Sequence, residues 1–273
     1  MAKLLSGKEL SYEILEDLKD KIADFRIKPS MAVIMIGLDL ESEGYQKFLE
    51  KARDMKINVE TFALEEDTAQ EEVLTLIEKL NNNKKIHGIL LQLPVPEDMD
   101  ENKLIDFIDP EKDIEGFSPE NLGWLSLGEP KVIPSTSQAI LKLLENTRIS
   151  IVSKQVCILG DNNFLARPLA QTFLSLGASV SVIDKIKEAV TQKADILICN
   201  LDDPNVIKKE MVKKNAVVID VMGDVDFDDV KKQASYITPW PEGVDSLMTA
   251  ALLTNAWKAM LRVEGYEDEG DIS

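Results

Sequence analysis

The sequence predicts an α/β protein with two successive α/β units, and two patterns carry this prediction. Short continuous apolar runs, typical of strands buried on both faces of a sheet, alternate with segments whose apolar residues recur at helical spacing. The alternation occupies residues 8–96 and starts again after residue 136. Alternation of this kind is typical of parallel sheets with helices on both faces, so the second unit is expected to be a doubly wound domain.

The first half alternates regularly. Its expected elements are a helix over 8–25, a strand over 31–37, a helix over 42–56, a strand over 57–64, a helix over 68–82 and a strand over 87–96. The third of these helices is expected to begin at the cap Thr68, with Glu71 and Glu72 in its first turn. Pro94 and Pro96 are expected to end the last strand.

The second half starts after a less periodic, acidic segment over 97–135, which is expected to be a long functional loop. A helix is expected from Thr136, and another over 164–177 that ends at Gly177. The remaining expected elements are strands over 155–160, 178–184, 194–200 and 216–223, and an amphipathic helix over 244–262. The acidic tail over 265–273 is expected to be disordered.

Composition excludes several classes of protein. The 273 residues include 31 basic and 49 acidic side chains, and 44% are hydrophobic. This length and apolar content suit one large or two modest domains with real cores. The net charge of −18 disfavours nucleic acid as a partner, because phosphate binding needs a basic surface.

Histidine and cysteine usage narrows the class further. His87 stands alone, so a metal site built from several histidines is not expected. Cys157 and Cys199 lie in separate apolar runs and are expected to be buried thiols in a reducing compartment. The N-terminal segment lacks a signal-peptide core, and no run approaches the ~20 apolar residues of a membrane span. We therefore expect a cytoplasmic protein without metal, membrane or nucleic-acid partners.

Three stretches of the first half are candidates for chemistry. On the helix over 42–56, Tyr45 and Leu49 share a face, which is also what an amphipathic helix packed on a sheet would show. Gln92 follows a buried strand, where open α/β sheets bind ligands, or it caps backbone groups before a proline turn. Asp113 and Glu115 precede a glycine and are acceptors for a ligand amine or amide, or part of a solvated turn.

The second unit contains a candidate nucleotide turn. Gly160 lies between a strand and a helix, where a glycine lets the backbone approach a pyrophosphate. Asp184 ends the next strand, at the place where Rossmann proteins keep an acid for the adenosine ribose. Asp161 and Asp184 would repel a 2′-phosphate, so the turn favours NAD over NADP, or no nucleotide. The GxGxxG fingerprint is absent, and a domain shape kept for packing alone is the alternative.

With these residues in hand, the chain resembles the methylenetetrahydrofolate dehydrogenase/cyclohydrolase family over nearly its whole length. The matching segments, in order, are Ser42-x-x-Tyr45, GILLQLPVP from Gly88, DPEKDIEGF from Asp109, Pro134-Ser135-Thr136, Gly160 with Arg167-Pro168, GDVDFDDV over 223–230, and YITPWPEGV from Tyr236 to Val244. The resemblance implies two lobes: a folate-type domain over 1–135 joined by the last helix over 244–264, and a Rossmann-like domain over 136–243.

The family resemblance also implies an activity and site residues. The activity is interconversion of methylene-, methenyl- and formyl-tetrahydrofolate in a cleft between the lobes, with a nicotinamide cofactor for the oxidation and commonly a homodimer. The matching positions, together with Asp184 from the strand pattern, give these roles: catalytic, Tyr45, Gln92 and the position of Leu49; substrate-binding, Asp113, Glu115 and Val244; cofactor-binding, Gly160, Asp161, Asn162, Arg167, Pro168 and Asp184.

Departures from the family pattern fall on these positions. The family helix has Tyr-x-x-x-Lys, and its lysine drives the cyclohydrolase step and polarises the folate; here Leu49 stands in its place. The acid before the glycine is Asp in the family and Glu115 here, one methylene longer. The family turn Gly-Arg-Ser is Gly160-Asp161-Asn162, which reverses the charge expected at a 2′-phosphate. The family segments Pro-Cys-Thr-Pro-x-Gly and Gly-Gly-Val-Gly-Pro-Met-Thr are altered over 134–139 and 242–248.

Three hypotheses follow from the resemblance and its departures. The first is an impaired or inactive family member that keeps part of the folate site and needs no cofactor if inactive. The second is a working NAD-linked dehydrogenase in which Tyr45 and a bound water replace the lysine. The third is an interaction subunit that pairs with an active homologue.

Overall fold

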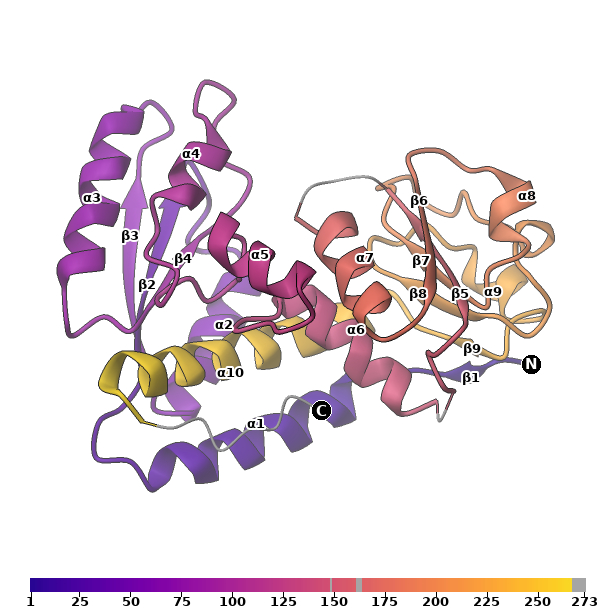
Figure 1. Ribbon diagram of the computed structural model, residues 1–273, viewed down its shortest axis with the longest axis horizontal. Coiled ribbons are helices and arrows are strands. Elements are labelled where there is room, and N and C mark those ends of the chain that lie inside the picture. Colours follow the sequence, from indigo (N-terminus) through magenta and orange to yellow (C-terminus); the bar gives the residue numbers. More distant parts are fainter. Residues whose placement is uncertain (148, 161–163, 267–273) are drawn as a thin grey trace. The chain divides into compact units, whose positions relative to one another are not determined.

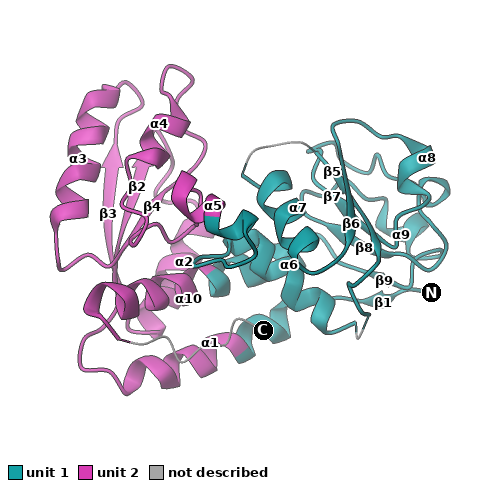
Figure 2. Ribbon diagram, in the orientation of Figure 1, with its two compact units in different colours: residues 1–13, 124–251 teal, residues 14–123, 252–273 magenta. Residues whose placement is uncertain are grey.

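The computed structural model describes residues 1–147, 149–160 and 164–266, and Figure 1 labels its elements. The chain forms two compact units, shown in separate colours in Figure 2. Unit 1 consists of residues 1–13 and 124–251, and unit 2 of residues 14–123 and 252–273. The segment expected to be Rossmann-like, 136–243, lies within unit 1, and most of the expected folate-type domain lies in unit 2.

Unit 2 contains a parallel three-stranded sheet with the strand order β3-β2-β4. The strands are β2 (Ser30–Ile36), β3 (Asn58–Leu64) and β4 (Gly88–Leu91). The central strand β2 is almost entirely buried, as its continuous apolar run predicts. The helices α1 (Gly7–Ala23), α2 (Glu43–Asp54) and α3 (Gln70–Asn82) confirm the three predicted before β4.

Three local predictions for the first half were wrong. Helix α3 begins at Gln70 with Ala69 at its N-cap, so Thr68 is not the cap. Strand β4 ends at Leu91 rather than at the prolines, because its partner β2 pairs only as far as that residue. The expected loop over 97–135 contains α4 (Glu101–Asp106) and α5 (Pro119–Ser126). These helices are too short to show helical periodicity, and the capping of α4 by Asp100 is a local signal.

Unit 1 contains a parallel sheet with the strand order β1-β9-β8-β7-β5-β6. Its strands are β1 (Lys3–Leu4), β5 (Gln155–Leu159), β6 (Ser179–Ile183), β7 (Ile196–Cys199), β8 (Val217–Asp220) and β9 (Tyr236–Ile237). From β5 the chain adds β6 on one side and then β7, β8 and β9 on the other. This reversal of strand order is the switch point at which open α/β sheets bind ligands.

The remaining helices are α6 (Ser135–Glu145), α7 (Ala166–Ser175), α8 (Glu188–Thr191), α9 (Phe227–Val230) and α10 (Val244–Glu264), with a short 3₁₀ turn η1 (Lys209–Met211). Gly177 follows α7 with φ +78°, which confirms the predicted glycine end. Within the described ranges, no helix combines the length and the apolar character needed to cross a membrane.

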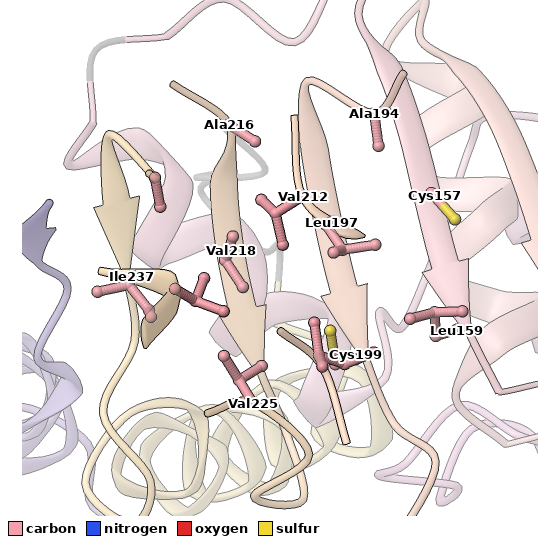
Figure 3. Close-up of a cluster of buried hydrophobic side chains, with 13 residues drawn as sticks. Cys157, Leu159, Ala194, Leu197, Cys199, Val212, Ala216, Val218, Val225 and Ile237 are labelled. Atoms are coloured by element: carbon pink, nitrogen blue, oxygen red, sulfur yellow. The ribbon is translucent and has the colours of Figure 1, made fainter. Parts of the chain in front are cut away.

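The core of unit 1 is formed by side chains of neighbouring strands. Figure 3 shows Cys157 and Leu159 of β5, Leu197 and Cys199 of β7, and Val218 of β8 within one apolar cluster. Both cysteines are free and at most 1% exposed. Burial raises the pKa of the Cys157 thiol to about 11, and it also raises the pKa of the Cys199 thiol well above its usual range. The two thiols therefore act as small apolar core groups, as predicted.

His87 ties the beginning of β4 to the end of α10 within unit 2. Its Nδ1 accepts a hydrogen bond from the Ser30 backbone N–H (3.0 Å), so the proton of the neutral ring lies on Nε2. Nε2 then donates to Glu264 Oε1 at 3.3 Å. Burial lowers the pKa of His87, Glu264 opposes that shift, and Lys112 adds to it. Protonation would also cost the Ser30 bond, because a protonated Nδ1 no longer accepts.

We therefore expect His87 to make the stability of unit 2 depend on pH. Below about pH 6.5, His87 binds a proton in the unfolded chain but stays neutral in the folded chain, where its pKa is lower. The free energy of unfolding therefore falls as the solution is acidified. In His87→Gln, whose amide oxygen can accept the Ser30 hydrogen bond, this part of the fall should disappear. Urea unfolding of both chains between about pH 5 and about pH 8 checks it. Equal pH slopes would contradict the expectation.

Candidate functional site

Helix α2 presents Tyr45 and Leu49, both half-buried, in unit 2. The Tyr45 hydroxyl lies 2.5 Å from Thr61 Oγ1 on β3, and its ring stacks on Phe48 with centroids 6.0 Å apart. Burial raises the pKa of Tyr45, so the phenol keeps its proton. The hydroxyl is thus bonded to the sheet, as the packing interpretation of this helix predicts.

The two lysines of α2 lie away from the Leu49 position. Lys47 forms an exposed ion pair with Glu43 at 2.5 Å. Lys51 is half-buried, and burial followed by repulsion from Lys47 lowers its pKa. Two residues along a helix correspond to a rotation of about 200°, so neither lysine shares the face of Leu49.

Gln92 follows β4 directly and is half-buried. Its backbone N–H donates to the Ile34 carbonyl at 2.9 Å, which extends the pairing with β2 by one bond. The side-chain amide donates to the Leu93 carbonyl at 3.2 Å. The residue stands at the carboxyl end of a parallel strand, and its amide lies against the proline turn.

Asp113 organises the turn that carries Glu115. Its carboxylate is 3% exposed and accepts four hydrogen bonds, from the backbone N–H groups of Glu115, Gly116 and Ser118 and from Asn121 Nδ2. An ionised carboxyl has about four lone-pair sites, so the turn itself uses them. Glu115 is half-buried beside it, and Gly116 takes φ +73°. The turn is a built structure rather than a solvated one.

Lys112, which the sequence reasoning missed, supports this turn. Its ammonium is buried and donates to three carbonyl oxygens at the end of α3, those of Leu80 (2.9 Å), Asn81 (2.7 Å) and Asn83 (2.9 Å). Burial lowers the pKa of Lys112, and Asp109 opposes the shift. A cation at a helix C-terminus is stabilised by the partial negative charge there. The only sequence signal was a lysine inside an apolar-poor loop, which gives no partner.

The candidate nucleotide turn lies at the switch point of unit 1. Gly160 has φ +98°, and a Cβ there would lie 2.2 Å from the Asn200 carbonyl oxygen, so only glycine fits. Its N–H donates to Ile183 at the end of β6. Asp184 is exposed immediately after that strand. The geometry therefore brings the ends of β5, β6 and β7 together at Gly160.

The other predicted cofactor-binding and substrate-binding residues differ in exposure, and two of them lie outside the described residues. Asp161 and Asn162 lie outside the described residues. Arg167 is exposed and Pro168 buried in the first turn of α7. Val244, the first residue of α10, has no exposed surface, so contact of its side chain with a ligand would require movement.

Buried carboxylates shape the loops beyond β7 and β8, and the sequence reasoning did not single them out. Asp224 accepts from the N–H groups of Leu201 and Asp203. Asp220 accepts from those of Gly223, Asp224 and Val225, while burial raises its pKa. Both groups therefore hold loop backbone at the carboxyl edge of the sheet.

Glu242 stands in the left-handed region with φ +83°, where a glycine is unstrained. It occupies the first glycine of the altered 242–248 segment. The following Gly243 permits close contact, since a Cβ there would lie 2.5 Å from the Pro239 carbonyl oxygen. The backbone of this loop thus keeps a shape suited to glycines although the side chain has changed.

These features define a two-unit α/β protein in which the sheet of unit 1 has the switch-point glycine of a dinucleotide-binding domain. Two family models match the chain: the catalytic domain of tetrahydrofolate dehydrogenase/cyclohydrolase over residues 5–115, and the NAD(P)-binding domain of the same enzymes over residues 134–264. The chain belongs to the tetrahydrofolate dehydrogenase/cyclohydrolase family.

Individual relatives agree over their full length. The bifunctional protein FolD of Agathobacter rectalis is 39% identical, over 96% of this chain and 100% of its own. The crystal structure of the bifunctional FolD methylenetetrahydrofolate dehydrogenase/cyclohydrolase from Campylobacter jejuni superposes with a TM-score of 0.90 at 35% identity, covering 95% and 99% of the two chains. A methylenetetrahydrofolate dehydrogenase from the silkworm Bombyx mori gives 0.87 at 33%, covering 95% and 98%.

Proposed function

We propose that this protein binds a tetrahydrofolate through unit 2 and a nicotinamide dinucleotide through unit 1, and that its hydrolytic step is lost or strongly impaired. The observation that carries the proposal is Leu49 at the lysine position of the family, on a helix whose lysines face elsewhere. We also propose that the protein acts in the cytoplasm, as its cysteine usage predicts, and that it pairs with a second copy, as the family resemblance implies.

The chemistry explains why the change at Leu49 matters. Hydrolysis of a methenyl group adds water to its carbon, removes a proton from that water and breaks a carbon–nitrogen bond as nitrogen is protonated. A positioned acid–base group speeds such proton transfers by ~10²–10⁴-fold, or about 3–5 kcal/mol of barrier. An aliphatic side chain has no proton to give or take, so Leu49 supplies none of this.

The residues present fit the two ligands in different ways. Gly160 lies in the strand-to-helix turn at the switch point, the place where dinucleotide-binding domains hold a pyrophosphate, and the dinucleotide, when bound, would accept a hydride. Gln92 and Glu115 offer polar groups for a pterin, while Asp113 fixes the turn around Glu115. Tyr45 holds its proton and a bond to Thr61, which supports packing and stacking rather than proton removal.

The test is binding and turnover by the unmodified chain. Calorimetric titration with tetrahydrofolate should show binding, whereas hydrolysis of methenyltetrahydrofolate, followed by absorbance, should run at least ~10²-fold below that of the Campylobacter jejuni relative. Equal rates would overturn the impaired-catalysis proposal. Absence of tetrahydrofolate binding would overturn the ligand itself and leave an interaction subunit.

We expect NAD to bind more tightly than NADP. Asp184 places an exposed carboxylate after β6, at the strand end next to the switch point, and a 2′-phosphate there would meet a like charge. Titration of both cofactors should give about tenfold weaker NADP binding. Asp184→Asn should narrow the gap, whereas Asp202→Asn, an exposed acid after β7, should leave it unchanged. Tighter binding of NADP would contradict the assignment.

A further inference from the structure

The peptide bond between Ile114 and Glu115 is held from both of its sides. Asn255 of α10 donates its buried Nδ2 to the Ile114 carbonyl oxygen at 2.8 Å. Asp113 Oδ1 accepts the Glu115 N–H at 3.2 Å. Because a peptide unit is planar, fixing its C=O and its N–H fixes the orientation of that plane. The next N–H, that of Gly116, also donates to Asp113 Oδ1 at 2.8 Å, which limits rotation about the Glu115 N–Cα bond and so restricts the direction of the Glu115 side chain.

Packing on the neighbouring strand limits any slide of this segment. Ile114 has no exposed surface and lies on Gly88 of β4, where an added Cβ would be 2.5 Å from Ile114 Cγ2. The Ile89 N–H donates to the Lys112 carbonyl at 2.7 Å, two residues before Ile114. These contacts limit translation of the segment along the sheet, whereas the hydrogen bond from Asn255 limits rotation of the Ile114–Glu115 peptide.

We propose that Asn255 is a positioning residue that sets the Glu115 carboxylate for a bound pterin, an inference that rests on the proposed folate binding. Asn255 is 3% exposed and supplies an amide donor that an apolar residue of similar size lacks. Without it, the Ile114 carbonyl is buried with one partner fewer and the peptide gains freedom to rotate. A misplacement of ~1 Å in a recognition group can cost on the order of 10²-fold.

The variant Asn255→Leu removes the donor at similar volume, and Glu264→Gln is the matched control on the same helix. Calorimetric titration with tetrahydrofolate should show roughly tenfold weaker binding for Asn255→Leu and unchanged binding for the control. In a Glu115→Ala background, Asn255→Leu should have no further effect, because its action passes through Glu115. If Asn255→Leu does not fold, Asn255→Ala removes the same donor with less bulk.

The outcomes separate the two proposals. Unchanged affinity in Asn255→Leu, or an equal loss in the Glu115→Ala background, overturns the positioning role while folate binding stands. An unmodified chain that does not bind tetrahydrofolate overturns the proposed function and this role with it.

Discussion

Leu49→Lys is expected to raise the rate of methenyltetrahydrofolate hydrolysis by ~10²-fold or more. The change returns an amine to the helix face that it occupies in the family, one turn beyond Tyr45. Leu49 is only half-buried, so a lysine stem can lie on the same apolar surface with its ammonium toward the solvent side. Absorbance at saturating substrate measures the gain.

Two control variants separate the amine from its charge. Leu49→Met keeps an apolar side chain of similar volume, and Gln46→Lys adds a positive charge at an exposed position of the same helix. Neither should raise the rate. A gain from Gln46→Lys equal to that from Leu49→Lys would mean that electrostatic attraction of the substrate, rather than proton transfer, limits the reaction.

Glu115 sets a limit on this gain. Its peptide is fixed by Asp113 and Asn255, so the backbone does not move to absorb the extra methylene. The carboxylate therefore lies farther from the turn than an aspartate would. We expect the double variant Leu49→Lys with Glu115→Asp to hydrolyse methenyltetrahydrofolate faster than Leu49→Lys alone.

The sequence predicted the parts of the fold that depend on local pattern. The apolar run of β2 and the glycine after α7 were sufficient signals, because burial on two faces and a left-handed helix end each require particular residue types. Gly160 was likewise predictable as a strand-to-helix turn. Its need to be glycine, however, comes from the carbonyl of Asn200, the residue after β7, and that contact exists only in the folded chain.

The sequence did not predict features that depend on partners distant in the chain. Two-residue β1 pairs with β9 more than two hundred residues later, and neither segment is long enough for a periodic signal. The hydrogen bonds that Asp113 accepts from backbone N–H groups exist only once the turn has folded, so the sequence showed this acid without its partners. Lys112 was passed over for the same reason, although its contacts connect α3 to the site turn.

Lys112→Met is expected to lower the free energy of unfolding by about 2–4 kcal/mol. The variant keeps an unbranched apolar stem but removes three charge-assisted hydrogen bonds to the end of α3. Those carbonyl oxygens then lose their donor and face the apolar methionine side chain. Water replaces the donor poorly, because the residue at position 112 is only 5% exposed. Such a loss is a large share of the ~5–15 kcal/mol that is typical for the free energy of unfolding of a protein. Urea unfolding followed by circular dichroism measures it.

Lys28 provides the matched comparison in the same unit. Its ammonium also donates to three carbonyls at a helix end: those of Ile22 (2.8 Å) and Ala23 (3.3 Å), the last residues of α1, and that of Phe25 (2.6 Å) just beyond it. The Lys28 side chain, however, is only half-buried. Water can replace the ammonium there, so Lys28→Met should cost about 1 kcal/mol. If burial decides the contribution of such a cap, Lys112 must exceed Lys28. Equal losses would show that the helix-end charge alone is responsible. Of the two variants, only Lys112→Met should also weaken tetrahydrofolate binding, because Lys112 holds the turn that carries Glu115.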